Sequence, residues 1–148
     1  IERADNTARI LDVRHHALLP ENALAGGGVD STQLTAILRS VSAHRSFRWV
    51  YRDAFKPWHI ADFLILNPQM PRSLRACYAE IAPALSGLAG YYGEETSCQS
   101  MAAATLEQLN GAEMQKIFHD GLHEFLRDFI ATNNRLASEI STVYHFND

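Results

Sequence analysis

Apolar residues recur at helical spacing along the whole of this chain, and this feature excludes most classes of fold. The clearest case is the stretch 112–143, where one face of the expected helix is apolar. That face carries Phe118, Leu122, Phe125, Phe129, Leu136 and Ile140. No segment alternates apolar and polar residues convincingly, so we predict no β-sheet. Five or six helices with short connections predict an all-α helical bundle in which the last helix is the longest.

Prolines, glycines and polar capping residues set the expected ends of these helices. The predicted helical ranges are 1–19, 31–53, 57–66, 71–91, 95–109 and 112–143. Pro83 falls inside the fourth range, and we expect a kink or a break there because proline lacks the amide N–H that a helix needs. Residues 20–30 include three consecutive glycines and are expected to form a flexible loop.

The size and composition of the chain fit one globular domain spanning residues 1–148. Hydrophobic residues make up 47% and charged residues 20%, a balance that argues against disorder. The net charge of −4 gives no overall attraction to nucleic acid. No apolar run approaches the ~20 residues of a membrane span. Cys77 and Cys98 form no paired motif, which is typical of a reducing compartment, so we expect a cytoplasmic protein.

The first predicted helix has a crowded polar face. At about 100° per residue, one narrow sector holds Glu2, Asn6, Arg9 and His16, with Asp5 and Asp12 beside it. Small apolar side chains occupy the opposite side. Two interpretations stay open. Glu2, Asn6 and Arg9 contact a substrate, a metal or a partner protein, or they belong to an ion-pair network that fixes how the helices meet. In the second case Arg9 pairs locally with Asp5 or Asp12.

Four blocks of sequence together resemble a known family. They are Glu2-Arg3-Ala4-Asp5-Asn6-Thr7-Ala8-Arg9 with Leu11-Asp12-Val13, then Ala61-Asp62-Phe63-Leu64-Ile65-Leu66-Asn67, Pro71-Arg72-Ser73 and Gly121-Leu122-His123-Glu124-Phe125-Leu126. In this order they resemble the alpha-E family, a helical domain with a Glu-Arg motif, over nearly the whole chain. The resemblance implies that Glu2 and Arg3 form this motif, and it supplies no catalytic residue.

The resemblance also implies partners. Such proteins typically carry the helical unit as a tandem pair, and this chain resembles the second unit. It starts inside a helical pattern without an initiator Met, so we expect a C-terminal piece of a longer protein. Family members are encoded beside or fused to ATP-grasp ligases and transglutaminase-like proteins. The implied setting is a bacterial system for peptide synthesis or modification. The expected partners are the first alpha-E unit and an ATP-grasp-type ligase or a transglutaminase-like protein.

Histidine and aspartate spacings raise the question of a metal site. Two Asp-x-x-His spacings end at His15 and His123, and His119 stands four positions before His123. Imidazoles at that spacing can share one zinc ion. The usual di-metal motif of helical bundles uses Glu rather than Asp, however, and seven histidines make chance spacings common. We therefore favour no metal and no cofactor. The residues to test for a metal are Asp12, His16, His119 and His123.

Positive charge gathers in one segment. Residues 39–75 carry a net charge of +5, and the remainder of the chain carries −9. Arg45, Arg48 and Arg52 fall on one face of the predicted helix 31–53, interleaved with aromatic residues. The guanidinium group of arginine binds phosphate or carboxylate and stacks on aromatic rings. This face is either an anion-binding surface or a solvated face that pairs with acidic groups elsewhere. An acidic chain is a poor candidate for binding nucleic acid.

Signatures of catalysis are absent from the sequence. It has no Gly-x-Ser-x-Gly elbow and no phosphate-binding Gly-x-x-x-x-Gly-Lys loop. We predict a non-catalytic adaptor or substrate-presenting subunit whose contact residues are Glu2, Arg3, Asn6 and Arg9. Two alternatives stay open. One is an enzyme that carries out metal-assisted hydrolysis or ligation. The other is a purely structural half of a larger bundle, which would expose a broad apolar patch.

Overall fold

A computed structural model describes residues 1–19, 31–52 and 55–145 of the chain. These residues form eight α-helices, one short 3-10 helix (η1, His15–Leu18) and no strand, so the all-α prediction is confirmed. The α-helices are α1 (Glu2–Val13), α3 (Ser31–Ser40), α4 (His44–Tyr51), α5 (Pro57–Ile65), α6 (Leu74–Tyr92), α7 (Ser97–Gly111), α8 (Met114–Asp120) and α9 (Leu122–Val143). The predicted loop 20–30 and the predicted helix end at Asp53 lie outside the described residues.

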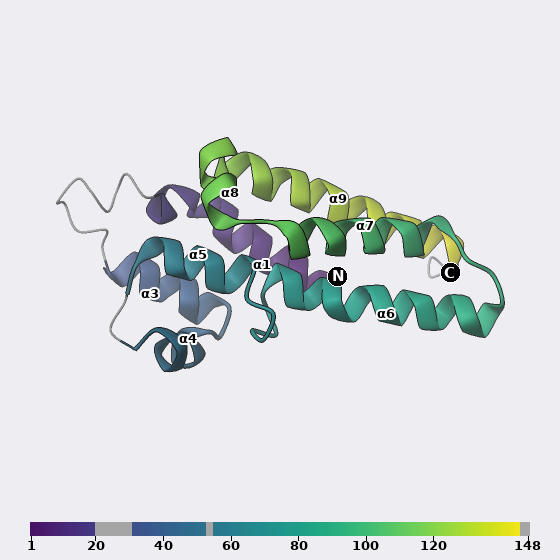
Figure 1. Cartoon of the computed structure of the whole chain (residues 1–148), viewed down its shortest axis with the longest axis horizontal. Helices are drawn as coiled ribbons and strands as arrows, with labels where there is room; N and C mark the ends of the chain where they lie inside the picture. The colour runs from purple at the N-terminus through teal and green to yellow at the C-terminus, as the bar shows by residue number, and fades with distance from the viewer. Residues whose placement is uncertain (20–30, 53–54, 146–148) are drawn as a thin grey trace.

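The helices are arranged along one long axis (Figure 1). α6, α7 and α9 lie side by side and make up the long half of the molecule, and α9, with 22 residues, is the longest helix described. α1 packs against α9 and α6. α3, α4 and α5 form the other end, where η1 contacts both α3 and α5. A single hydrophobic cluster includes buried side chains from every one of these helices.

Small side chains let α1 pack closely against its neighbours. Ala4, Ala8 and Leu11 are fully buried and repeat at helical spacing, and the side chains at a helix contact set how near the two axes approach. Because this narrow apolar side is buried, most of the opposite polar face is left at the surface. The polar face predicted from the sequence therefore lies where it can meet other molecules.

Two of the predicted helices are each divided in two, which raises the helix count above five or six. The range 31–53 breaks at Ser42, whose φ of 55° ends α3 with Ser42 and Ala43 donating back to the Arg39 and Leu38 carbonyls. This pairing is a Schellman-type helix end. The range 112–143 breaks at Gly121, where a φ of 116° turns the chain between α8 and α9. Glycine adopts such a conformation at little cost.

Two further predictions need correction, one at the end of the first helix and one inside the fourth predicted range. α1 stops at Val13 rather than 19, and residues 15–18 continue as the tighter η1. At Pro83 we expected a kink or a break, and the break is wrong because α6 runs through this residue. Pro83 removes the donor for the Ala79 carbonyl, but both residues are on an exposed face of α6. Water can bond that carbonyl there, so the helix continues.

Two hydrogen bonds that share one buried residue connect three helices in the core. The Tyr78 hydroxyl of α6 donates to the Asn133 side-chain oxygen of α9 at 2.8 Å, and both residues are fully buried. The Asn133 amide donates in turn to the Ile1 carbonyl at the start of α1, at 3.3 Å. Buried polar groups need such partners. This network therefore helps to set the position of α1 and its polar face.

Candidate functional site

The Glu-Arg motif occupies the first turn of α1, and its two side chains have different roles. Arg3 Nη1 donates to the Pro71 carbonyl and to Glu80 Oε2, each at 3.4 Å. Arg3 thus joins α1 to α6 and to the turn before it. Glu2 is exposed and makes no hydrogen bond or ion pair within the described part of the chain. The arginine of the motif is used inside the fold, and the glutamate is available to another molecule.

Arg9 pairs with Asp5, one of the two acidic partners that the sequence offered. Its Nε donates to Asp5 Oδ2 at 2.8 Å, one turn away on α1, and this hydrogen bond raises the pKa of Arg9. Asp12 instead faces His123 of α9, with Oδ1 and Nδ1 2.6 Å apart. The polar contacts of this face are therefore partly local and partly between helices, and Arg9 belongs to the local set.

A shallow groove runs between the start of α1 and the middle of α9. It has a volume of about 360 Å³, and its polar lining includes Glu2, Asn6 and Asn134. Asn6, like Glu2, has no hydrogen-bond partner among residues 1–19, 31–52 and 55–145. With Asp5 and Asn133, which also line it, the groove combines two carboxylates with three amides, a set that recognises hydrogen-bond donors and acceptors of a peptide. Sequence reasoning missed Asn134, because nothing in the sequence pairs α9 with α1.

The arginines of α4 lie together, as their spacing predicted. Arg45, Arg48 and Arg52 line an open depression of about 310 Å³ with Trp49 between them. Trp49 is 82% exposed. None of the three guanidinium groups is within ion-pair distance of a carboxylate in the described ranges. The depression therefore offers unpaired positive charge around an aromatic ring.

The other aromatic residues of α4 belong to the core rather than to this depression. Phe47 is buried against Phe63 and stacks on Tyr51, whose hydroxyl donates to Asp62 at 3.3 Å. Burial, with the nearby Asp62 charge, raises the pKa of Tyr51 to about 12. Of the aromatic side chains interleaved with the arginines, only Trp49 faces solvent.

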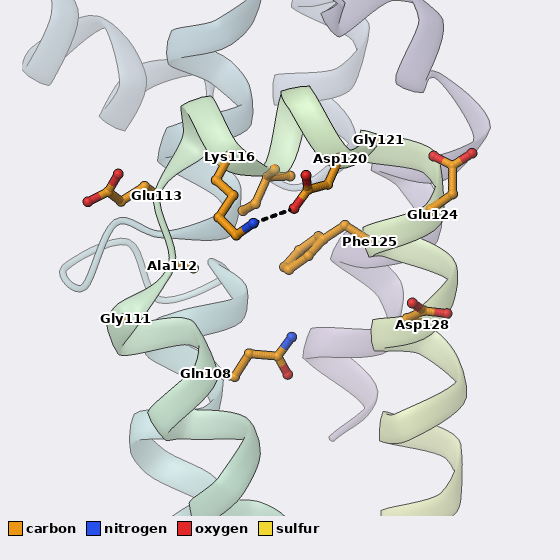
Figure 2. A pocket seen from close by; sticks show the side chains of 11 residues that line it. Gln108, Gly111, Ala112, Glu113, Lys116, Asp120, Gly121, Glu124, Phe125 and Asp128 are labelled. Carbon is orange, nitrogen blue, oxygen red and sulfur yellow. Dashed lines mark hydrogen bonds and ion pairs between the residues drawn. The ribbon is translucent and has the colours of Figure 1, made fainter.

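The structure also contains an acidic cavity that the sequence analysis did not identify. It has a volume of about 650 Å³ and lies between α7, α8 and the start of α9 (Figure 2). Its charged lining consists of Glu113, Lys116, Asp120, Glu124 and Asp128. Lys116 donates to Asp120 at 2.8 Å, and this hydrogen bond lowers the pKa of Asp120. The surplus of carboxylates suits a cationic group. The only sequence sign was the acidic spacing of Glu124 and Asp128, one helical turn apart.

The four candidate metal ligands do not all meet. Asp12 and His123 are in contact, as described above. His16 lies in η1 and His119 in α8, and neither belongs to the group of potential ligands that Asp12 and His123 form. The i, i+4 pairing of His119 with His123 fails as a basis for a site, because Gly121 breaks the helix between them.

A helical fold with a Glu-Arg motif on its first helix defines a class of all-α domains. The sequence model of one family, Alpha-E, described as a predicted alpha-helical domain with a conserved ER motif, matches residues 1–145. The chain therefore belongs to the Alpha-E family. No curated protein and no solved structure matches the chain. Across the described residues, no helix has both the length and the apolar character needed to cross a membrane.

Proposed function

We propose that this domain is a non-catalytic adaptor or substrate-presenting subunit that binds an acidic segment of a partner protein or peptide. One observation carries the proposal: Trp49 stands exposed among three arginines that have no acidic partner in the described chain. Trp and Arg are the residues most enriched among those that dominate binding energy at protein interfaces. Guanidinium groups hold carboxylates in a two-pronged geometry.

The charge distribution supports an acidic partner. Residues 39–75 are strongly positive within a chain that is negative overall. Complementary charge of this kind raises the rate of encounter and selects against wrong partners. A carboxylate-rich segment would pair with Arg45, Arg48 and Arg52, while an apolar or aromatic side chain of the partner packs on Trp49.

The groove at the Glu-Arg motif supplies a second contact in the same proposal. Glu2 and Asn6 face it without partners of their own in the described chain. Arg3 instead joins α1 to α6, and Arg9 is paired within α1. Large exposed apolar side chains occur at both ends of the molecule. Tyr91 and Tyr92 end α6, and Trp49 lies on α4 at the opposite end of the molecule (Figure 1).

Membership of the Alpha-E family guides the choice of partner. The family's association with ATP-grasp ligases and transglutaminase-like proteins supports a role in a bacterial peptide-synthesis or peptide-modification system. In this proposal the domain holds the ligase or its peptide substrate, and a first Alpha-E unit of the parent protein contributes to the same assembly. The bond-forming chemistry belongs to the ligase.

The test is capture of the partner from the native cell by the full-length parent protein, with retained proteins identified by mass spectrometry. Wild type is compared with an Arg45→Ala, Arg48→Ala variant. The matched control removes two other exposed arginines, as Arg127→Ala, Arg135→Ala on α9, and so loses the same charge. We expect wild type and the control to retain an ATP-grasp-type or transglutaminase-like protein and the α4 variant to lose it.

Two results would contradict the proposal. One is that no such protein is retained by wild type. The other is that the α4 variant retains as much as the control, which would remove α4 as the contact. A Glu2→Ala, Asn6→Ala variant in the same experiment tests the groove separately. Reduced retention by that variant with an intact circular dichroism spectrum is expected.

A further inference from the structure

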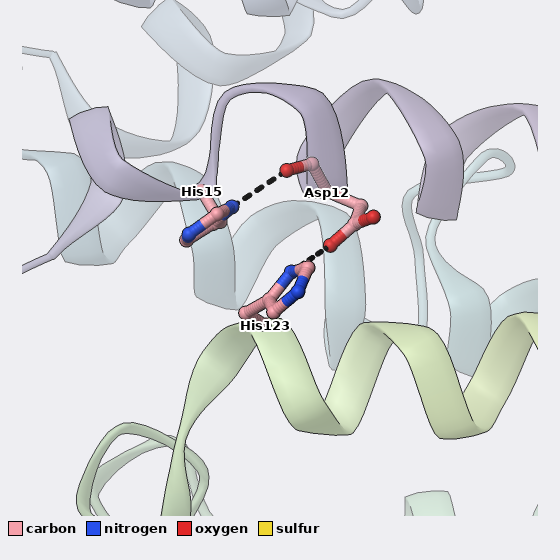
Figure 3. Close-up of side chains that lie close together, drawn as sticks. All are labelled: Asp12, His15 and His123. Carbon is pink, nitrogen blue, oxygen red and sulfur yellow. Dashed lines mark hydrogen bonds and ion pairs between the residues drawn. The ribbon is translucent and has the colours of Figure 1, made fainter.

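Three side chains of the types that bind metal ions lie close together where α1 ends and α9 begins. They are Asp12 in the last turn of α1, His15 at the start of η1 and His123 in the first turn of α9 (Figure 3). One ligand atom from each lies within 4.8 Å of the other two. All three residues are half-buried, so the cluster is shielded from bulk water and yet open to an ion.

The hydrogen bonds of the cluster orient both imidazoles. His15 Nδ1 is 2.7 Å from the Asp12 backbone oxygen, which can only accept, so this nitrogen carries the proton and His15 Nε2 keeps its lone pair. His123 Nδ1 is 2.6 Å from the Asp12 carboxylate. A ring nitrogen held by a backbone carbonyl, as in His15, is typical of metal-binding histidines. The His123 nitrogen and the Asp12 oxygen face each other as two candidate ligand atoms.

The two rings also lie against each other. Their centroids are 4.5 Å apart and their planes differ by 29°. Two imidazoles stacked beside one carboxylate concentrate electron-donating atoms in a small volume.

We propose that Asp12, His15 and His123 bind one divalent transition-metal ion, and we take Zn²⁺ as the test ion because two histidines and one carboxylate form known zinc sites. Three protein ligands leave at least one coordination position open for water or for a group of a bound molecule. Catalytic zinc sites keep an open position in the same way, whereas structural zinc sites have four protein ligands. The ion joins α1 to α9 across 111 positions of sequence. It therefore couples the helix that carries the Glu-Arg motif to the longest helix described.

This site differs from the one that histidine spacing suggested. It uses His15 in place of His16 and excludes His119, which lies on the far side of the Gly121 break. The site is also independent of the adaptor proposal, because its residues are not those of the α4 depression or of the groove at Glu2. Either proposal can fail while the other stands.

The experiment is a Zn²⁺ titration of the tag-free, chelator-stripped chain by calorimetry. It compares wild type, His15→Gln, His123→Gln and the matched control His119→Gln. We expect wild type and the control to bind about one Zn²⁺ per chain, and each ligand variant to lose about 10-fold or more in affinity. Circular dichroism verifies that each variant is folded. Failure of wild type to bind, binding by either ligand variant as tight as wild type, or an equal loss in the control would overturn the proposal.

A second measurement needs no variant. Diethyl pyrocarbonate modifies accessible histidines, and peptide mapping by mass spectrometry gives the extent of modification at each position. Added Zn²⁺ is expected to protect His15 and His123 and to leave His119 unchanged. Equal modification of His15 and His123 with and without Zn²⁺ would overturn the proposal even if the substituted proteins do not fold.

Discussion

Replacing Tyr78 with Phe is expected to destabilise the fold by about 1–3 kcal/mol, the usual cost of leaving a buried polar group unpaired. The Tyr78 hydroxyl donates to the Asn133 side-chain oxygen at 2.8 Å, and both residues are fully buried. The Phe variant keeps the ring and its contact with Phe129. It removes only the hydroxyl group. The Asn133 side-chain oxygen is then left without its donor at a buried position that water does not readily reach.

Urea unfolding followed by circular dichroism measures the effect. For a chain near this length, each kcal/mol lowers the melting temperature by about 2–4 °C. The matched control is Tyr91→Phe, since Tyr91 is 84% exposed. A substitution of that kind is expected to stay within about 0.5 kcal/mol of wild type.

The double variant Tyr78→Phe, Asn133→Leu separates the hydrogen bond from other effects. Once both polar partners are gone, nothing buried is left unpaired by the loss of the other, so the double variant should lose less than the sum of the two single losses. Strict additivity, or a Tyr78→Phe stability equal to that of Tyr91→Phe, would refute the role given to this bond in joining α6 to α9.

Three further predictions concern the remaining buried or strained groups. Thr7→Val is expected to stabilise the fold by about 1 kcal/mol in urea unfolding, because the buried Thr7 hydroxyl has no hydrogen-bond partner among the described residues; a loss of stability would contradict this. Gly121→Ala should cost about 1–3 kcal/mol because of its φ of 116°. The control Gly90→Ala meets nothing within 4 Å and should gain about 0.5–1 kcal/mol; equal effects of the two would refute the strain argument. Because the pKa of Tyr51 is raised to about 12, its contribution to stability is complete below pH ~10 and is lost as the pH rises toward that value. In an ultraviolet absorbance titration, the Tyr51→Phe variant should lack the tyrosine ionisation that wild type shows near pH 12. A titration curve equal to that of wild type would contradict the raised pKa of Tyr51.

Features that depend on neighbours within a few turns were predictable from the sequence. The all-α class follows from helical spacing, and so do the polar face of α1 and the shared face of Arg45, Arg48 and Arg52. In each case the position of a residue around a helix axis depends only on its number in the chain. The location of the Glu-Arg motif on the first helix follows for the same reason.

Only the tertiary structure decided which of these residues meet across helices and where the helices end. Arg3 contacts Glu80, and Asp12 contacts His123 with His15 nearby. The helical periodicity of the sequence does not encode contacts between different helices. Ser42 ends α3 with a φ of 55° between the buried Val41 and Ala43. A helix fixes angles around its own axis, but contacts between helices depend on how all the apolar faces are buried at once. For that reason the sequence alone determined the faces of this protein, and the packing of its helices determined the sites.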